Sequence, residues 1–116
     1  MSDAIARLTK LACDFRDERD WKQFHNLKDM VVSLALEAAE VLELAQWKNE
    51  TELRKYLAEH PEKLEDELAD VLYWILVLAH DNGIDLAKAF EKKIEKNRKK
   101  YPVEKARGIA KKYTEL

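Results

Sequence analysis

The stretch MVVSLALEAAEVLELA, residues 30–45, decides the fold. It is apolar nearly all round except for one serine and three glutamates. Residues three apart are neighbours on a helix surface, so Glu37 and Glu40 project from one face and Glu43 continues the row. Such an apolar helix should pack centrally, so the pattern predicts carboxylates where a core is expected.

A second stretch repeats this arrangement. Glu67 and Asp70 stand three residues apart, directly before the strongly apolar run 71–79. Isolated buried carboxylates are costly, and like charges at this spacing destabilise a helix by roughly 0.2–0.5 kcal/mol even when exposed. A divalent cation between the two helices would remove the repulsion.

The type of ion follows from the donor atoms. Four carboxylates without histidine or cysteine form a hard oxygen site, which suits Mg²⁺ or Mn²⁺ better than Zn²⁺. A di-iron carboxylate bundle would need Glu-x-x-His, and no histidine here has a glutamate three residues before it. The alternative is a solvated acidic stripe with Lys or Arg partners. That alternative suits either pair alone, whereas two matched pairs on the two most apolar helices favour a metal site.

Composition limits the remaining choices. The 116 residues include 47% hydrophobic and 38% charged residues, two glycines and two prolines, which predicts a single all-α domain over residues 1–116 and argues against a β-sandwich or barrel. Neither glycine-rich phosphate-binding motif can be built from Gly83 and Gly108. Cys13 is the single cysteine, so no internal disulfide is expected. No secretory segment and no run of ~20 apolar residues is present, so we expect a cytoplasmic protein without a membrane span.

Helix signals divide the chain into an antiparallel four-helix-type bundle. Ser2 or Asp3, Asn26, Asn49 and Asp85 can cap helices, and Asn49 with Glu52 resembles a capping box. The expected helices cover about 3–20, 27–47, 50–59, 61–82 and 86–101, and an irregular tail follows over 102–116.

Charge is distributed unevenly along the chain. Residues 1–87 carry a net charge of −9, whereas residues 88–112 carry +8. The acidic part could bind metal and the basic part phosphate. A rival interpretation is a basic helical nucleic-acid-binding or regulatory module, but it leaves the carboxylates on apolar helices unexplained, so nucleic acid is a disfavoured partner. A third interpretation is a purely structural oligomeric bundle.

The acidic pairs also resemble a known family. Glu-x-x-Glu at 37–40 followed by Glu-x-x-Asp at 67–70 is similar to the motif of the MazG-like all-α nucleoside triphosphate pyrophosphohydrolases. Further segments resemble the dCTP pyrophosphatase branch and extend the similarity over nearly the whole chain: 18–25, 44–48, 97–102 and 111–116. The connection between residues 48 and 65 departs from that branch, being shorter than in the animal enzymes.

The resemblance implies an activity and an assembly. It implies Mg²⁺-dependent hydrolysis of a nucleoside triphosphate, dCTP or a modified dCTP in particular, to the monophosphate and pyrophosphate in nucleotide-pool housecleaning. A preference for dUTP or a broad specificity stays open. It further implies a homotetramer, as a dimer of dimers, with active sites completed between subunits and the tail packed on a neighbour.

The resemblance also carries roles over to matching positions. The metal ligands and catalytic residues are Glu37, Glu40, Glu67 and Asp70. The base and sugar would be enclosed by Trp21, His25, Trp47 and Trp74. The phosphate-facing residues would be Lys93, Asn97, Arg98 and Tyr101. The alternative, structural interpretations are a core or interface role for Trp47 and Trp74, and a local hydrogen-bonding role for His25.

Overall fold

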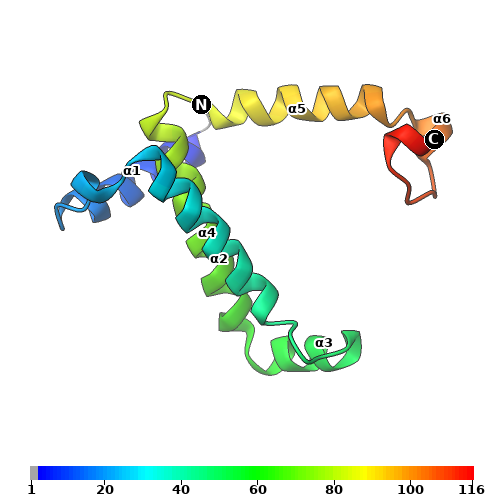
Figure 1. Cartoon of the computed structure of the whole chain (residues 1–116), viewed down its shortest axis with the longest axis horizontal. Helices are drawn as coiled ribbons and strands as arrows, with labels where there is room; N and C mark the ends of the chain where they lie inside the picture. Colours follow the sequence, from blue (N-terminus) through cyan, green and yellow to red (C-terminus); the bar gives the residue numbers. More distant parts are fainter. Residues whose placement is uncertain (1–2) are drawn as a thin grey trace.

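A computed structural model describes residues 3–116 of the chain. Within that range the regular structure is entirely helical, which confirms the all-α prediction (Figure 1). The elements in chain order are α1 (Asp3–Asp17), the 3₁₀ turn η1 (Lys22–Phe24), α2 (Leu27–Glu43), α3 (Glu50–Glu59), α4 (Pro61–Asp81), α5 (Leu86–Lys100), α6 (Val103–Ala106) and the 3₁₀ turn η2 (Tyr113–Glu115).

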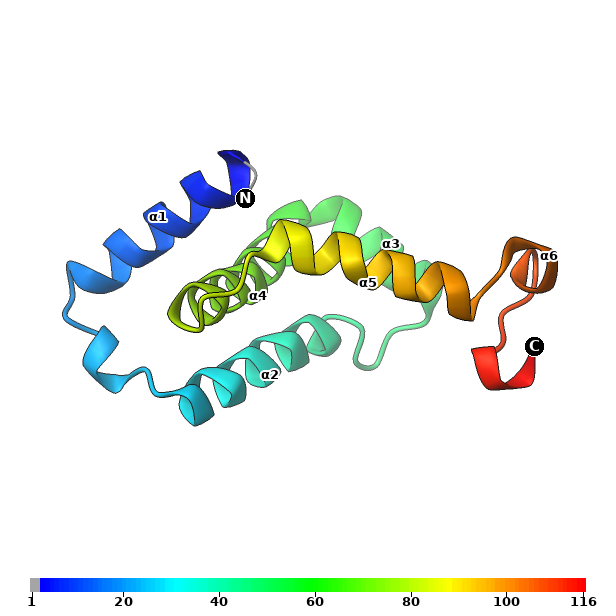
Figure 2. The ribbon, with the colours of Figure 1, turned by 90° about the horizontal axis from the view of Figure 1, so that it is seen from above.

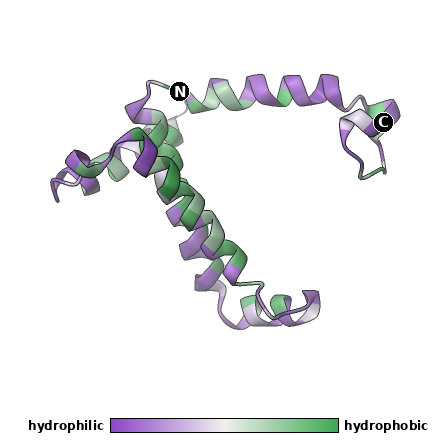
Figure 3. Cartoon of the chain, in the orientation of Figure 1, coloured by the Kyte–Doolittle hydropathy of each residue, from purple (hydrophilic) through white to green (hydrophobic). Residues whose placement is uncertain are grey.

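The centre of the fold is an antiparallel pair of long helices, α2 and α4. The short helix α3 connects them at one end, and α1 crosses α4 near the other (Figures 1 and 2). Met30 of α2, Val77 of α4 and Ala12 of α1 meet in one buried cluster, where Val77 is fully buried. Full burial of such a side chain contributes ~1.5–3 kcal/mol, so these contacts fix how the three helices cross. Figure 3 shows the apolar residues concentrated along this pair.

Local capping residues set the helix starts as predicted. Asn26 accepts a hydrogen bond from the backbone N–H of Asp29, and Asn49 with Glu52 forms a capping box. Asp85 caps α5 in the same way. The proposed cap at Ser2 lies outside the described residues. These side chains satisfy backbone donors that the first turn of a helix leaves free.

Two helices end earlier than predicted, and both ends place a non-glycine residue in the left-handed region. Helix α1 ends at Asp17 rather than near Asp20, whose φ is 54°. Helix α2 ends at Glu43 rather than at 47 or 48, and Trp47 has φ 67°. Apolar residues continue past Glu43 to Trp47, and the charged residues 18–20 fit an exposed helix end, so neither pattern reveals where the chain reverses.

The tail is less irregular than predicted. It contains α6 and η2, and the rings of Tyr101 and Tyr113 lie edge to face with their centroids 5.9 Å apart. Lys100 lies over the ring of Tyr113 at 4.9 Å. These contacts connect the end of α5 to the last residues of the chain.

A single chain forms only part of the predicted antiparallel four-helix-type bundle. Helix α5 projects away from the α2–α4 pair and has no extensive packing against another helix (Figure 1). Large apolar side chains are exposed on α2, α5 and α6: Leu36 61%, Leu42 73%, Phe90 69% and Val103 68%. None of the helices described in residues 3–116 is long and apolar enough to cross a bilayer.

A buried ion pair ties α1 to the end of α4. Both terminal nitrogens of the Arg16 guanidinium donate to the Asp81 carboxylate, at 2.7 and 3.0 Å, and the Arg16 side chain is 1% exposed. The hydrogen bonds from Arg16 hold the pKa of Asp81 below its usual value of 3.8. Asp81 therefore contributes stability above pH 3.8, and that contribution is lost as the pH falls through its lower folded-state pKa.

Replacing Asp81 by Asn should destabilise the fold by about 3–5 kcal/mol, because it leaves the buried charge of Arg16 with only Asp17, an exposed carboxylate 3.9 Å from its Nε, as a counter-charge. Urea denaturation at pH 7 measures this loss. Asp14→Asn is the matched control, because it breaks an exposed ion pair with Lys10 on α1 and should cost less than about 1 kcal/mol. Equal effects of the two substitutions would contradict the role given to the Arg16–Asp81 pair.

Candidate functional site

The two acidic pairs meet between α2 and α4. One carboxylate oxygen from each of four residues lies within 4.8 Å of the others: Glu37, Glu40, Glu67 and Asp70. Glu37 and Glu67 are half-buried, whereas Glu40 and Asp70 are exposed. Helical spacing places each pair on one face, and the antiparallel packing of α2 on α4 turns the two faces toward each other.

This proximity changes the acidity of the cluster. Burial, together with the neighbouring Glu40 carboxyl, raises the pKa of Glu37 from 4.5 to about 7. Contact with Glu40 and burial also raise the pKa of Glu67. Without a cation, the cluster therefore retains protons at pH values where isolated glutamates are ionised.

The donor set fits a hard divalent cation. One carboxylate oxygen of Glu37 and one of Glu67, both Oε2, are buried and have no hydrogen-bond partner within residues 3–116. Buried acceptors without a partner cost free energy, and a cation would satisfy them. Carboxylate oxygens are the donors that Mg²⁺ and Mn²⁺ prefer. Glu37, Glu40, Glu67 and Asp70 are therefore candidate ligands for such an ion.

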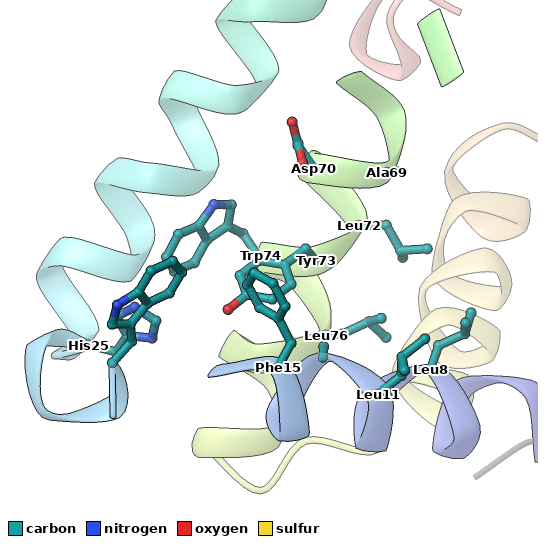
Figure 4. A pocket seen from close by; sticks show the side chains of 12 residues that line it. Leu8, Leu11, Phe15, His25, Ala69, Asp70, Leu72, Tyr73, Trp74 and Leu76 are labelled. Carbon is teal, nitrogen blue, oxygen red and sulfur yellow. The ribbon is translucent and has the colours of Figure 1, made fainter. Parts of the chain in front are cut away.

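An aromatic pocket of about 550 Å³ opens beside this cluster, between α1, the segment around η1 and α4. Trp21, His25 and Trp74, three of the predicted base-enclosing residues, line it. The His25 and Trp74 rings lie 5.1 Å apart. Figure 4 shows the aromatic side chains toward one side of the pocket and leucines of α1 and α4 toward the other.

Asp70 belongs to both the carboxylate cluster and the pocket lining. Tyr73 and Trp74 follow it by three and four residues on α4, which is one helical turn of about 5.4 Å. The four carboxylates and the aromatic pocket are thus adjacent parts of one site that share Asp70, the member of the cluster that Figure 4 shows at the pocket.

Two aromatic residues of the pocket, Phe15 and Tyr73, were not among the predicted site residues. The Phe15 ring contacts Trp21 and Tyr73, with centroid distances of 5.6 and 6.0 Å, and Tyr73 contacts Trp74 at 5.2 Å. Phe15 continues the helical spacing of Ile5, Leu8 and Leu11, and Tyr73 lies within the apolar run 71–79, so the pattern predicts a core position for both. The adjacent Tyr73–Trp74 pair, one helical turn after the acidic motif at 67–70, was the available signal.

Trp47 lies at the other end of α2 from His25. The helix between them has 17 residues, so the two side chains start about 25 Å apart. Trp47 is 91% exposed and has a left-handed backbone, which is uncommon for a bulky residue. Within one chain, Trp47 is therefore not part of the aromatic pocket.

The predicted phosphate-facing residues all belong to α5 or its end, and they do not line the aromatic pocket of the same chain. They are Lys93, Asn97, Arg98 and Tyr101. Arg98 forms an exposed ion pair with Glu95. Because α5 projects from the rest of the chain, the phosphate-facing role of these residues stays a prediction.

The fold and the site together define a class: all-α proteins in which two antiparallel helices bring Glu-x-x-Glu and Glu-x-x-Asp carboxylates together. Residues 32–116 match the MazG-like family, and the chain belongs to that family. The recognition made from the acidic pairs is confirmed.

Curated relatives carry a more specific name. The chain is 40% identical over 111 residues to dCTP pyrophosphatase 1 of Mus musculus, and 37% identical over 111 residues to dCTP pyrophosphatase 1 of Homo sapiens. Each alignment covers 94% of this chain and 65% of the relative, so the chain spans about two thirds of the length of these proteins.

A solved structure supports the fold. The crystal structure of a pyrophosphatase from Archaeoglobus fulgidus superposes with a TM-score of 0.80 at 35% identity. The match covers 88% of this chain and 95% of that protein. The arrangement of helices around the acidic motifs is therefore shared with a protein of similar size.

The raised pKa of Glu37 predicts how stability depends on pH. In the chelated protein, the melting temperature should fall as the pH rises from about 4.5 to about 7, because Glu37 loses its proton beside three other carboxyl groups. Scanning calorimetry in EDTA measures this slope. Glu37→Gln should flatten it, whereas Glu62→Gln, an exposed position on α4, should not. An identical slope in all three proteins would refute the assignment.

Proposed function

We propose that this chain hydrolyses a deoxynucleoside triphosphate, dCTP or a modified dCTP, to the monophosphate and pyrophosphate with Mg²⁺. The observation that carries the proposal is Asp70, which joins the carboxylate cluster to the aromatic pocket. A nucleotide has a flat aromatic base at one end and a polyanion at the other, and these two parts of the site match those chemistries. The names of the relatives support the same substrate class.

The carboxylate cluster would bind the cation that accompanies the triphosphate. Glu37, Glu40, Glu67 and Asp70 would hold Mg²⁺, which would supply charge neutralisation and activation of water. The protein itself positions the polyphosphate, because its carboxylates are held on two packed helices rather than on loops. A carboxylate of this cluster can also accept a proton from the attacking water.

The aromatic pocket would hold the base. Trp21 and Trp74 offer ring faces, and the pKa of His25 is lowered by burial, so its imidazole is neutral at pH 7. A neutral aromatic pocket suits an uncharged base and does not suit phosphates. The two ends of the nucleotide are therefore distinguished by the chemistry of the two parts of the site.

Pyrophosphate release in the presence of Mg²⁺ tests this proposal. We expect release from dCTP or 5-methyl-dCTP in a panel with the other three deoxynucleotides, and loss of activity by orders of magnitude in Glu40→Gln and Asp70→Asn. The physical reason is that each substitution removes an anionic ligand while leaving the buried core unchanged.

Glu62→Gln is the matched control, because this exposed glutamate of α4 lies outside the cluster and should retain wild-type activity. No pyrophosphate from any nucleotide of the panel would refute the proposed reaction. Orthophosphate as product would correct the bond that is cleaved.

The second part of the proposal concerns assembly. A homotetramer built as a dimer of dimers would cover the exposed apolar residues of α2 and α5. It would bring Trp47 and the basic residues of α5 from one copy to the pocket and carboxylates of another, and would place the tail 102–116 on a neighbour. The separation of Trp47 from His25 and the unpartnered α5 support this arrangement.

Mixing two inactive variants tests whether the sites are shared. Trp47→Ala and Asp70→Asn should each be inactive alone, and refolding them together should restore a substantial fraction of activity, because mixed assemblies contain some sites with both residues intact. Sedimentation velocity gives the assembly state in the same samples. Asp70→Asn refolded with itself at the same total concentration is the control, and it should show no rescue. A monomer, or a mixture as inactive as its components, would refute the shared site.

A further inference from the structure

A short link carries one side of the aromatic pocket. Trp21 lies in the link between the end of α1 at Asp17 and the start of η1 at Lys22, and Phe15 lies in the last turn of α1. Their rings meet edge to face, with centroids 5.6 Å apart and an interplanar angle of 79°. Each residue is 42% exposed. Burial alone therefore does not fix the two rings, and their position depends on the contacts that the link makes.

Hydrogen bonds of Arg16 fix the backbone of the link. The backbone N–H groups of Arg19 and Trp21 both donate to the Arg16 carbonyl, at 3.2 and 3.1 Å. The Arg16 side chain is in turn held by Asp81 of α4. The Cα atom of Trp21 is thus placed relative to α4, but its indole can still rotate about the side-chain torsions. Contacts of the ring itself have to select one rotamer.

Arg19 supplies such contacts. The central carbon of its guanidinium lies 4.0 Å from the centroid of the Phe15 ring and 5.9 Å from that of the Trp21 ring. Its Nη1 donates a hydrogen bond of 2.9 Å to the backbone carbonyl of Phe15. A guanidinium is attracted to the face of an aromatic ring, and its planar shape allows stacking and hydrogen bonding at once. Arg19 therefore holds both the backbone and the ring of Phe15 and borders Trp21.

Phe15 transmits this constraint to the pocket. Its ring also meets the Tyr73 ring of α4, with centroids 6.0 Å apart and an interplanar angle of 86°. Figure 4 shows the Phe15 ring directed from α1 toward Tyr73. With Arg19 over its face and two rings nearly perpendicular to it, the Phe15 ring has little freedom to turn. The pocket beside it, of about 550 Å³, is open in this arrangement.

The ion pair of Arg19 does not explain its placement. Its partner Glu18 lies 3.4 Å away, and the two side chains are 42% and 69% exposed. Exposed ion pairs of this kind contribute little to stability. The contacts that distinguish Arg19 from an ordinary surface arginine are those with residues of the pocket.

We propose that Arg19 is a positioning residue for the base end of the site, which holds Phe15 and Trp21 in the arrangement that admits a planar ring. Arg19 acts through these two rings rather than by contact with the nucleotide. Rings that are ordered before binding lose less conformational freedom when a base enters, so the affinity for a nucleotide is higher. This inference rests on the proposed binding of a nucleotide and adds a residue that determines how tightly the base is held.

The effect of Arg19 should be confined to the base end. Phe15 and Trp21 belong to α1 and the link, whereas the four carboxylates belong to α2 and α4. Binding of a polyphosphate with Mg²⁺ therefore does not require the two rings. Inorganic tripolyphosphate reports on the carboxylate end alone, and a nucleotide reports on both ends.

Titration calorimetry of Arg19→Ala in the full chain tests the inference. The probes are α,β-imido-dCTP, which resists cleavage between the α and β phosphates, and inorganic tripolyphosphate, both with Mg²⁺. We expect the Kd of the nucleotide analogue to rise about fivefold, as for the loss of one cation–ring contact, and the Kd of tripolyphosphate to stay unchanged. In the hydrolysis assay, KM should rise by the same factor at unchanged kcat.

A second variant shows whether Arg19 acts through Phe15. In a Phe15→Leu background the ring that Arg19 holds is absent, so the addition of Arg19→Ala should not weaken nucleotide binding further. If the effects of the two substitutions simply add, Arg19 acts on the substrate directly, and the proposal is overturned.

Arg54→Ala is the matched control, because it removes an exposed arginine of α3 that is paired with Glu50 outside the pocket. It should have a melting temperature similar to that of Arg19→Ala and bind both probes as wild type does.

The inference is also overturned if Arg19→Ala binds the nucleotide analogue as wild type does, if it loses affinity for both probes alike, or if the wild-type chain binds no nucleotide. A wild-type chain that binds the analogue but releases no pyrophosphate would refute the proposed hydrolysis. A selective loss of analogue binding in Arg19→Ala would then still support the assignment of Arg19.

Discussion

Repulsion among four carboxylates is the constraint on which the arrangement of this chain depends. The contacts that bury Met30 and Val77 also press Glu37 against Glu40, Glu67 and Asp70. Apolar packing and charge repulsion therefore act on the same pair of helices in opposite directions. The shifted acidity of Glu37 and the two unpartnered glutamate oxygens are local signs of this opposition. A cation would offset the repulsion among the carboxylates, so the same cluster affects both the stability of the helix pair and the chemistry of the site.

Much of the fold could be predicted from the sequence because its signals are local. Asn26, Asn49 and Asp85 mark helix starts through bonds that span three residues, and the structure places helices there. Helix ends were harder to predict. Asp20 and Trp47 have left-handed backbones where the chain reverses. A glycine at these positions would have predicted such a backbone conformation, whereas aspartate and tryptophan do not predict it.

The site was predictable to a different degree in its two parts. The carboxylates could be found because i, i+3 spacing and the apolar character of their helices are visible in sequence. The pocket depends on α1 crossing α4, so Phe15 and Tyr73 meet across a long separation in the chain. Periodicity assigns both to the core and contains no information on which core residues border a cavity. Arg16 and Asp81, 65 residues apart, were missed for the same reason.

The single helical turn between Asp70 and Trp74 fixes the distance between the carboxylate and the ring. Helix α4 is continuous from Pro61 to Asp81, so the offset between ring and carboxylate cannot adapt to the molecule that enters. A ligand anchored by its ring would bring the same phosphorus atom to the acidic residues whether its phosphate chain is short or long. The position of cleavage would then be chosen by the length of one rigid backbone segment and not by the reactivity of the bonds.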